Sequence, residues 1–591
     1  MTKKLLILST VFLILTAIAC SADTPTVRHT VTFLNADDSV FHKMQVEDNQ
    51  TVNPPTEDPV PVIEGYLIKG WSMQEDGSEL FDFSTPVRAD IILYPVFASN
   101  LEYILKDDGT LSVKRYRNSS RVNVLTIPSE YEGIEITSIE SEAFTQFQGN
   151  EIHIPASISS IGDHAFLMCS ASIIVDEDNT NYTAVDDVLF NKDMTTLISC
   201  PISKSTADGN YKVPDSVTAI SDYAFFLNSL NSISLHKNIQ EIGVCAFSNW
   251  YGQLILDKDN TEYSFEEGVL FNKDKTTLIS CTNRVSPYYK VPDTVTSIAN
   301  YAFSYCTPLK EILLPKGISS IGESAFVNCY AQIILEEGTN EYILKDDVLF
   351  NKDMTTLISC TKSKEGSYNV PDTVTKIADT AFQDCYYLTE IHLPASLTEI
   401  GENVFVRTSS LTSITVDESN NNYASVDGVL FNKDKTILIQ YPNAKAGTSY
   451  EIPNTVNTIS ELAFFGSDNL ESLTIPGSVT TIGANAFRFA MYLTSIEIPE
   501  SITAIPEGAF SYCFALSSVT LPSNLVSIGD EAFADCQALT TIEIPESVET
   551  ISYTAFRFIE GNIEINVNKR KYSILGAPWG AENATVIWNQ D

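Results

Sequence analysis

The sequence predicts a mainly β protein, in which a long solenoid of short repeats with inserted β-hairpins follows a small β-rich module. The dipeptide Ala-Phe, with Val-Phe once, recurs thirteen times, and many neighbouring copies are evenly spaced. The motif VLFNKD recurs four times, starting at Val188, Val269, Val348 and Val429. Residues 29 to 98 contain short runs of alternating apolar and polar residues, which are typical of strands. A fixed period marks repeat architectures, whose units bury a core only by stacking on each other.

The repeat unit has the period of a leucine-rich repeat, which is about 20–29 residues. The evenly spaced phenylalanines at the C-terminal end show it best: Phe464, Phe487, Phe510, Phe533 and Phe556. In the unit spanning residues 493–510, Ile496 and Ile498 lie on one side of a short predicted strand and Glu497 lies on the other, because successive strand side chains alternate. Phe510 is expected to point inward and to stack on its equivalents in the neighbouring units.

The outward strand residues form a column along the predicted solenoid. Such columns line an extended face, which many solenoids use for binding. An alternative stays open, in which short polar side chains only solvate the sheet. The predicted contact residues are His153, Ser234, Leu313, His392, Thr474, Glu497, Thr520 and Glu543.

The blocks around VLFNKD predict β-hairpins inserted between pairs of repeats, because apolar runs flank a polar Asn-Lys-Asp turn. The expected boundaries are a signal peptide at 1–19, a tether at 20–27, the β-rich module at 28–98, an N-terminal cap at 99–134, the solenoid at 135–565 and a C-terminal cap at 566–591.

The N-terminus predicts export. Lys3 and Lys4 precede the apolar stretch LLILSTVFLILTAIA, which is too short to span a membrane. Ala17-Ile18-Ala19 before Cys20 resembles the lipobox of bacterial lipoproteins, although Ala17 stands where leucine is usual. This resemblance implies a lipid on Cys20 and an anchor at the bacterial cell surface, in the outer membrane. Ordinary cleavage after Ala19 is the alternative, since Ala-x-Ala precedes that site too.

The ten cysteines beyond Cys20 follow the repeat. Most of them end either an A-F-x-x-C motif or a TTLISC motif, and equivalent positions elsewhere hold Asn228 or Ala490. A residue that recurs once per repeat and is replaced this freely behaves as a small buried hydrophobe. We expect a ladder of reduced thiols and no zinc site, because no CxxC pair or paired histidine spacing occurs.

Charge and motifs argue against several functions. The net charge of −40 disfavours nucleic acid as a partner. No catalytic constellation is present among the six histidines, and no cofactor motif occurs, so we expect neither enzyme activity nor a cofactor. Acidic stretches such as VDEDNTNY and VDESNNNY do not keep their number of oxygen ligands between copies, which favours solvated turns over calcium sites.

The segments LPKGISSIGESAFVNCYAQIIL and LPSNLVSIGDEAFADCQALTTIEIP resemble the BspA-like leucine-rich repeats of bacterial surface proteins. This resemblance covers about residues 120 to 590 and implies caps at both ends, with Trp579 and Trp588 in the C-terminal cap. Residues 29 to 98 resemble the internalin B-repeat (Listeria-Bacteroides repeat) family, chiefly at Gly70-Trp71 and residues 83–86. The first resemblance implies an adhesin for extracellular protein or glycoprotein ligands, such as host matrix proteins, host cells or other bacteria. Two alternatives are a carbohydrate-binding protein, with Tyr305, Tyr386 and Tyr512 as candidates, and a spacer without a ligand.

Overall fold

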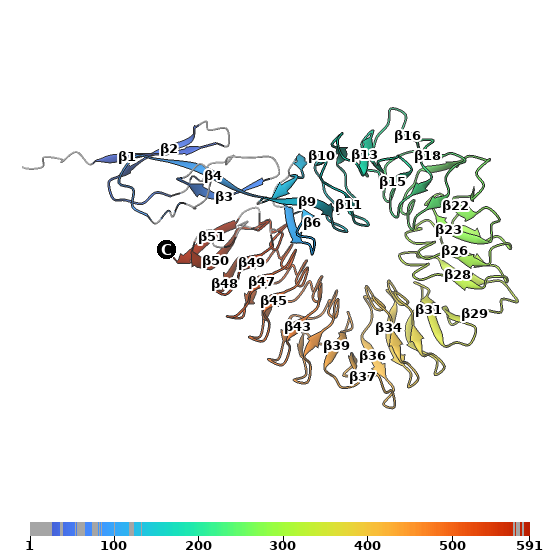
Figure 1. The fold of residues 1–591 in the computed structure, drawn as a ribbon. Coiled ribbons are helices and arrows are strands. Elements are labelled where there is room, and N and C mark those ends of the chain that lie inside the picture. The colour runs from blue at the N-terminus through green and yellow to red at the C-terminus, as the bar shows by residue number, and fades with distance from the viewer. Residues whose placement is uncertain are drawn as a thin grey trace, which may run out of the picture. The chain divides into compact units, whose positions relative to one another are not determined.

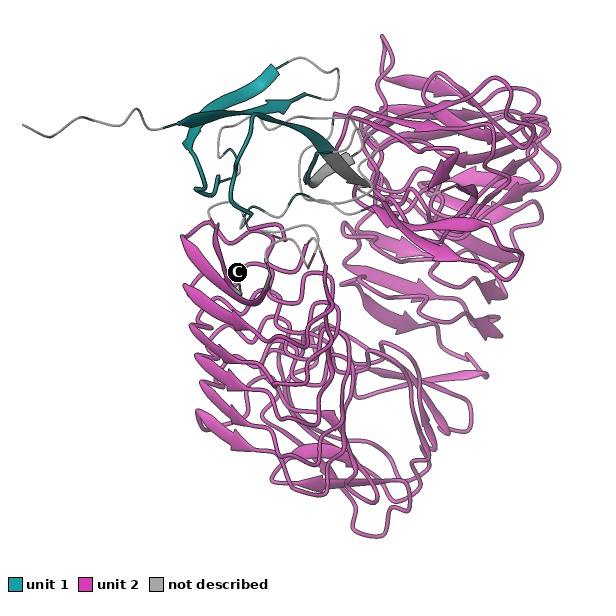
Figure 2. Cartoon of the chain, turned by 60° about the vertical axis from the view of Figure 1, so that its left-hand side comes forward, with its two compact units in different colours: residues 1–98 teal, residues 99–591 magenta. Residues whose placement is uncertain are grey.

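The chain forms two compact units, Met1–Ala98 and Ser99–Asp591 (Figure 2). The computed structural model describes residues 27–35, 40–53, 55, 66–73, 81, 83, 85–99, 101–116, 123–131, 133–552, 554–570, 574, 579–581 and 584–590. The expected signal peptide, most of the tether and Cys20 lie outside these residues and stay predictions. Within the described part of the chain, no helix is long and apolar enough to cross a membrane.

The first unit is one four-stranded sheet in the order β2-β1-β4-β3. Its strands are β1 (Arg28–Leu34), β2 (Val40–Glu47), β3 (Tyr66–Ser72) and β4 (Ile91–Ser99). β1 pairs antiparallel with β2 and parallel with β4. Phe33 and Trp71 are buried, and their ring centroids lie 4.8 Å apart in an edge-on arrangement. Trp71 is therefore a core residue of this module.

The second unit is an all-β solenoid whose repeats follow a curved path (Figure 1). At its N-terminal end, β5 (Leu101–Leu105) and β6 (Leu111–Tyr116) form a hairpin that continues in parallel through β9 (Ile134–Ile139) to β11 (Ser160–Ile161). β8 (Glu130–Tyr131) pairs with β9. The predicted solenoid with inserted hairpins is thus confirmed.

Two columns of parallel strands run along the solenoid. We call the first the outward-face column, because it carries the predicted contact residues. Its strands are β7 (Val124–Thr126), β10 (Glu151–Ile154), β12 (Ser172–Val175), β16 (Asn210–Lys212), β18 (Ser232–Leu235), β20 (Gln253–Leu256), β24 (Tyr288–Lys290), β26 (Glu311–Leu314), β28 (Gln332–Leu335), β32 (Gly366–Asn369), β34 (Leu388–Leu393), β36 (Ser413–Val416), β40 (Ser449–Glu451), β42 (Ser472–Thr474), β44 (Ser495–Glu497), β46 (Ser518–Thr520), β48 (Thr541–Ile544), β50 (Ile563–Arg570) and β51 (Ala584–Gln590).

The second column consists of two-residue strands, which pair in parallel from repeat to repeat. Besides β11 its members are β17 (Ala219–Ile220), β19 (Glu241–Ile242), β25 (Ser297–Ile298), β27 (Ser320–Ile321), β33 (Lys376–Ile377), β35 (Glu399–Ile400), β41 (Thr458–Ile459), β43 (Thr481–Ile482), β45 (Ala504–Ile505), β47 (Ser527–Ile528) and β49 (Thr550–Ile551).

Each VLFNKD block forms the middle strand of an antiparallel three-stranded meander that joins the second column. The predicted hairpins are confirmed, and the structure adds one strand before each of them. The strands are β13 (Tyr182–Val185), β14 (Val188–Asn191), β15 (Thr196–Ser199), β21 (Tyr263–Glu266), β22 (Val269–Asn272), β23 (Thr277–Cys281), β29 (Tyr342–Lys345), β30 (Val348–Asn351), β31 (Thr356–Cys360), β37 (Tyr423–Val426), β38 (Val429–Asn432) and β39 (Ile437–Gln440).

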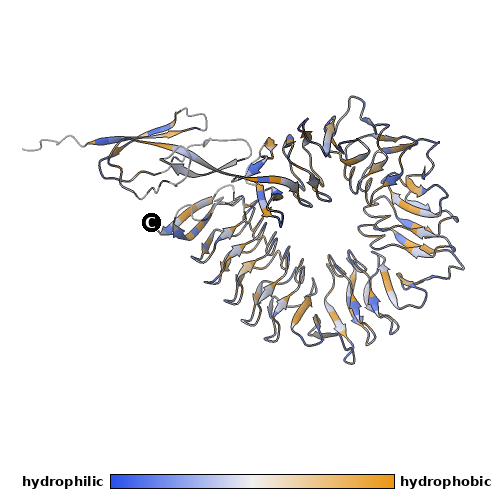
Figure 3. Ribbon diagram, in the orientation of Figure 1, coloured by the Kyte–Doolittle hydropathy of each residue, from blue (hydrophilic) through white to orange (hydrophobic). Residues whose placement is uncertain are grey.

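The repeated phenylalanines form the core of the solenoid. Adjacent rings in the plain repeats are nearly parallel, with centroids 5.0 Å apart for Phe487 and Phe510 and 5.4 Å apart for Phe510 and Phe533. All three are fully buried. Apolar and polar positions alternate along the strands (Figure 3), as in β44, where Ile496 is buried between two exposed residues. Each unit therefore completes the core of its neighbour.

The C-terminal end is closed by a bulky aromatic residue. Trp579 is fully buried, and its ring centroid lies 6.4 Å from that of Phe556, the last phenylalanine of the series. Trp588, on β51, is half-buried and packs against the same core. The two tryptophans thus continue the stack beyond the final repeat.

The prediction that every repeat cysteine is a reduced thiol is wrong at one pair. Cys281, at the end of β23, forms a disulfide with Cys306, at a sequence separation of 25. The two cysteine motifs lie in different parts of the repeat. The last meander strand ends beside the turn of the next repeat, so the two kinds of cysteine meet there. The other described cysteines are free and buried: Cys169, Cys200, Cys245, Cys329, Cys360, Cys385, Cys513 and Cys536.

Candidate functional site: an outward strand face and a repeated pocket

The eight residues predicted to contact a ligand all lie at outward positions of the outward-face column. The four C-terminal residues are exposed, and the four N-terminal residues are partly buried. In the parallel register, Glu497 of β44 pairs with Thr520 of β46, and Thr474 lies on the other neighbouring strand, β42. The structure brings only these three into one sheet. The remaining five lie one to a sheet: His153, Ser234, Leu313, His392 and Glu543.

Sequence reasoning missed apolar residues on the same face. His153 pairs in register with Ile174, Ser234 with Ile255, and Leu313 with Ile334. Ile255 is 45% exposed, which is high for an isoleucine in a sheet. The signal was present in the sequence, because SIIVD, QLILD and QIILE are unbroken apolar runs where a half-exposed strand should alternate.

The outward face therefore has two chemically different zones. We call the turn and VLFNKD meander together with the two repeats that follow a super-repeat. In the first and second super-repeats the face presents Lys212 and Lys290, in register with Ser234 and Leu313. Lys290 Nζ lies 3.0 Å from a carboxylate oxygen of Asp293, and this hydrogen bond raises the lysine's pKa. The C-terminal zone alternates carboxylates and hydroxyls, namely Glu451, Thr474, Glu497, Thr520 and Glu543. An extended basic segment of a partner would find its complement in the C-terminal zone.

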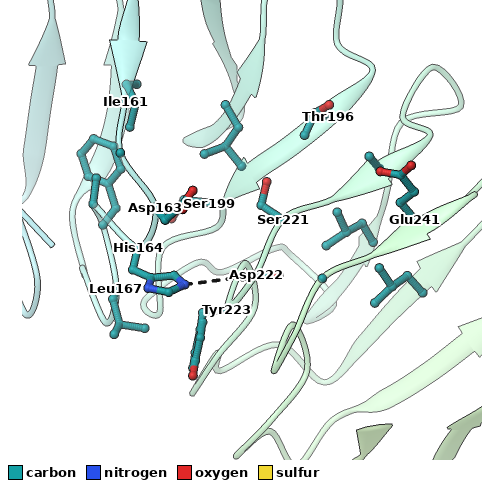
Figure 4. A pocket seen from close by; sticks show the side chains of 18 of the residues that line it. Ile161, Asp163, His164, Leu167, Thr196, Ser199, Ser221, Asp222, Tyr223 and Glu241 are labelled. Atoms are coloured by element: carbon teal, nitrogen blue, oxygen red, sulfur yellow. Dashed lines mark ion pairs between the residues drawn. The ribbon is translucent and has the colours of Figure 1, made fainter. Parts of the chain in front are cut away.

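A pocket of about 510 Å³ lies beside the first meander (Figure 4). Its rim is formed by two turns that carry the Ala-Phe dipeptide, at residues 162–167 and 221–225. The strands of the first meander separate these two turns in sequence. His164 and Asp222 face each other across it, with 4.0 Å between Nε2 and the nearer carboxylate oxygen. The His164 ring stands edge-on to Tyr223, with centroids 4.7 Å apart. Asp163 and Glu241 add two more carboxylates to the lining.

The same pocket recurs at two further meanders. One is lined by the turn of residues 322–327 and the other by the turn of residues 401–406, and each holds about 270 Å³. In all three, the residue after the Ile-Gly pair is acidic: Asp163, Glu323 and Glu402. The pockets arise because an inserted meander holds consecutive turns apart. This explains why sequence periodicity alone did not reveal them.

One pocket carboxylate already has a structural role. An oxygen of Asp222 accepts a 2.6 Å hydrogen bond from the backbone N–H of Val244 in the next turn. Asp379 does the same for Glu402, and the neutral Asn300 does it for Glu323. Because asparagine fills this position equally well, the negative charge there is not required for folding.

His164 Nε2 has no hydrogen-bond partner in the described part of the chain. Among the described residues, no group of three or more His, Cys, Asp or Glu side chains is placed to hold a metal ion. The carboxylates and the Tyr223 ring suit a cationic side chain, which both charge attraction and the aromatic ring would favour.

The tyrosines suggested for carbohydrate binding pack against other aromatic rings. Tyr512 stacks on Phe489 with centroids 4.6 Å apart, and Tyr386 lies parallel to Tyr330 at 6.4 Å. Tyr305 stands edge-on to Phe226 at 5.4 Å. A sugar stacks on a ring face that no other side chain covers. Each of these tyrosine rings instead packs with a face or an edge against a neighbouring aromatic ring. Packing therefore accounts for their recurrence.

The fold and this face define a class: a leucine-rich-repeat β-solenoid with an extended, solvent-exposed strand surface. The chain belongs to the BspA type leucine-rich repeat family, whose model matches residues 110–250, 209–288, 280–356, 359–443 and 440–561. The Listeria-Bacteroides repeat domain matches residues 29–96. The resemblances to these two repeat families are thus confirmed. Proteins of this repeat family are bacterial surface proteins, and leucine-rich repeats generally mediate protein interactions.

A search of solved structures found bacterial leucine-rich-repeat proteins that this chain is similar to. A leucine rich cell surface protein from Faecalibacterium prausnitzii is 23% identical, covering 80% of this chain and 95% of its own, with a TM-score of 0.36. A leucine-rich repeat protein from Eubacterium ventriosum is 23% identical, covering 50% and 94%, with a TM-score of 0.31. The pneumococcal vaccine antigen PcpA is 18% identical, covering 84% and 98%, with a TM-score of 0.26. No curated protein matches the chain.

Proposed function

We propose that this protein is a non-enzymatic adhesin, anchored by a lipid on Cys20, which binds extracellular protein or glycoprotein ligands along the outward-face column. The observation that carries the proposal is the exposed, in-register run of Glu451, Thr474, Glu497 and Thr520 on one parallel sheet. Family membership supports a role at the bacterial surface in contact with other proteins.

The proposed binding is shared among many weak contacts. Outward positions recur in every repeat, so one ligand lying along the array meets several similar sites, and linkage between the sites raises the total affinity. No single substitution is then expected to abolish binding. The acidic C-terminal zone favours ligands with basic segments, whose attraction weakens as salt screens it.

The test is a charge reversal on the face. We expect Glu497→Lys with Glu543→Lys to weaken binding to a basic matrix protein more than either change alone, most strongly at low salt. Both side chains are exposed, so the melting temperature should stay unchanged. The matched control is Glu546→Lys with Glu549→Lys, which makes the same charge change at exposed positions outside β48. Binding is measured on immobilised matrix proteins at two salt concentrations.

Three outcomes would contradict the proposal. If the control pair weakens binding as much as the face pair, the effect comes from net charge and not from the face. If the mature chain binds a glycan array and no matrix protein, the carbohydrate-binding alternative replaces the adhesin. If a chain without the solenoid, containing the first unit alone, keeps all ligand binding, the solenoid is only a spacer.

A further inference from the structure

Cysteines form pairs at two meander junctions. Cys281 ends β23, and its disulfide partner Cys306 lies in the following Ala-Phe turn. One super-repeat later, Cys360 ends β31, and Cys385 occupies the same turn position at the same sequence separation of 25. Cys360 and Cys385 are free in the structure, and both are buried.

The backbone places the two pairs identically. Cys281 N–H donates to the carbonyl of Ala302 at 2.8 Å, and Cys360 N–H donates to that of Ala381 at 2.7 Å. In the turn, the N–H of Cys306 and that of Cys385 each donate over 3.1 Å to the carbonyl of the preceding phenylalanine. The main chain of the second pair therefore already has the arrangement that the bonded pair has.

The sulfur atoms occupy matching positions as well. Cys281 Sγ lies 3.5 Å from the carbonyl oxygen of Thr282, and Cys360 Sγ lies 3.5 Å from that of Thr361. Their partners approach the same oxygens, Cys306 at 3.7 Å and Cys385 at 3.8 Å. Both thiols of the second pair thus meet at one carbonyl, as the two bonded sulfurs do.

We propose that Cys360 and Cys385 form a second disulfide, so that both central super-repeats are covalently closed at the meander junction. Each bond would tie the last meander strand to the next repeat and would close a loop of the same length. In the first super-repeat the position of Cys306 holds Asn228, whose amide donates to Cys200 Sγ at 3.4 Å. There a hydrogen bond takes the place of the covalent bond.

The oxidation is a thiol–disulfide exchange with a protein or small-molecule disulfide. One thiolate, formed by loss of a proton to solvent, attacks the oxidant, so a mixed disulfide forms and one thiolate of the oxidant leaves. The second cysteine, also deprotonated, attacks the mixed disulfide. The Cys360–Cys385 bond forms as the second thiolate of the oxidant leaves. Two cysteines are oxidised and one disulfide is reduced. Because both thiols are buried in the folded chain, the exchange must precede packing of the following repeat.

The test counts thiols in a chain that begins at Ser21, refolded with oxidised glutathione and then alkylated in denaturant. Refolding in vitro keeps this test independent of the proposed export and adhesion. Of ten cysteines, two disulfides leave six for alkylation, and a peptide linked through Cys360 and Cys385 should be found by mass spectrometry. Finding eight reactive thiols, or a different partner for Cys360, would overturn the proposal.

Three variants test the pairing through the number of reactive thiols. Cys360→Ser should give seven reactive thiols, since Cys385 loses its partner, whereas Cys513→Ala should give five. Asn228→Cys should create a third bond with Cys200, because Cys200 N–H donates to the carbonyl of Ala224 as Cys281 donates to that of Ala302. Five reactive thiols are then expected. Nine reactive thiols in this variant would show that only the Cys281–Cys306 bond forms, and would overturn the proposal.

Discussion

At the scale of single residues, the glycine of the repeated Ile-Gly pair is fixed by the close approach of neighbouring repeats. A Cβ atom on Gly483 would lie 2.3 Å from the backbone nitrogen of Glu461, and Gly162, Gly243 and Gly529 face the preceding turn in the same way. Such contacts are far shorter than van der Waals separation. The role of this glycine is therefore steric.

Replacing this glycine should loosen the stack. We expect Gly483→Ala to lower the free energy of unfolding by about 1–3 kcal/mol, the usual cost of forcing extra atoms into a packed site. Gly477 is the matched control, because a Cβ there meets nothing within 4 Å. Gly477→Ala should be neutral or stabilising by about 0.4–1 kcal/mol, through a less flexible unfolded chain. Urea unfolding of both variants decides, and equal effects would refute the steric explanation.

The alternation rule predicted which side chains face outward but not which of them share a sheet. Glu497 and Thr520 were placed correctly by counting along the strand. The facing of His164 and Asp222 could not be predicted, because they come from turns on either side of a meander. The alternation of residues along a strand shows which way a side chain points. The distance between two turns depends on the strands inserted between them, and alternation does not show that.

At the scale of elements, the acidic stretches before three of the four meanders are tight turns held by a buried asparagine, namely Asn179, Asn260 and Asn420. Asn420 is fully buried, and its amide donates to the carbonyls of Pro394 and Leu397 at 2.8 and 3.0 Å. Its side-chain oxygen accepts from the N–H groups of Asn422 and Tyr423, both at 2.8 Å. The acidic residue nearby caps the turn: Asp417 accepts from the N–H of Ser419. These contacts support the interpretation of the stretch as a turn.

Removing this side-chain amide should destabilise the turn before the fourth meander. We expect Asn420→Ala to cost at least about 1–3 kcal/mol, because buried backbone groups lose their partners. Asn420→Thr should cost less, since Thr339 fills this position in the third super-repeat and donates to the carbonyl of Glu336 at 2.8 Å. Hydrogen exchange at the Tyr423 amide measures the local effect. If the Tyr423 amide is as well protected in Asn420→Ala as in the natural chain, the Asn420 side chain does not hold the turn.

The meanders also show where element prediction from sequence ends. The alternating pattern and the Asn-Lys-Asp turn predicted the hairpins, because both features are local. The disulfide between Cys281 and Cys306 was missed, because it depends on which turn the last strand of the meander meets. Pairing the cysteine of TTLISC with the cysteine of the next A-F-x-x-C motif requires knowing that the end of the meander contacts that turn, which the sequence does not show.

At the scale of the whole molecule, the proposed attachment to the cell depends on the N-terminus, which lies outside the described residues. If Cys20 carries a lipid, Cys20→Ser should abolish labelling by a radioactive fatty acid and leave a released or uncleaved chain. The solenoid should keep its melting temperature, because Cys20 lies outside residues 99–591, which form the solenoid unit. Cys169→Ala, at a buried repeat cysteine, is the control and should label normally. Unchanged labelling of the Cys20 variant would rule out acylation at this residue.

The buried thiols also make the stability of the solenoid depend on pH. Burial raises the pKa of Cys169, Cys200 and Cys513 to about 12 and that of Cys329 to about 11, from an ordinary value of 9.0. The folded chain therefore holds these protons where the unfolded chain releases them. Their contribution is fully present below pH 9 and is lost as the pH rises from 9 toward 11 or 12.

We expect each of these thiols to lower the free energy of unfolding by about 1 kcal/mol between pH 9 and 10, which follows from about 1.36 kcal/mol per pKa unit. Urea unfolding at pH 7, 8, 9 and 10 measures the slope. Cys513→Ala should reduce the loss, because alanine does not ionise and already fills this position as Ala490 in the preceding repeat. If the variant and the natural chain lose stability in parallel above pH 9, the thiols are not the cause. Surface tyrosines and lysines, which titrate in both chains, would then account for the effect.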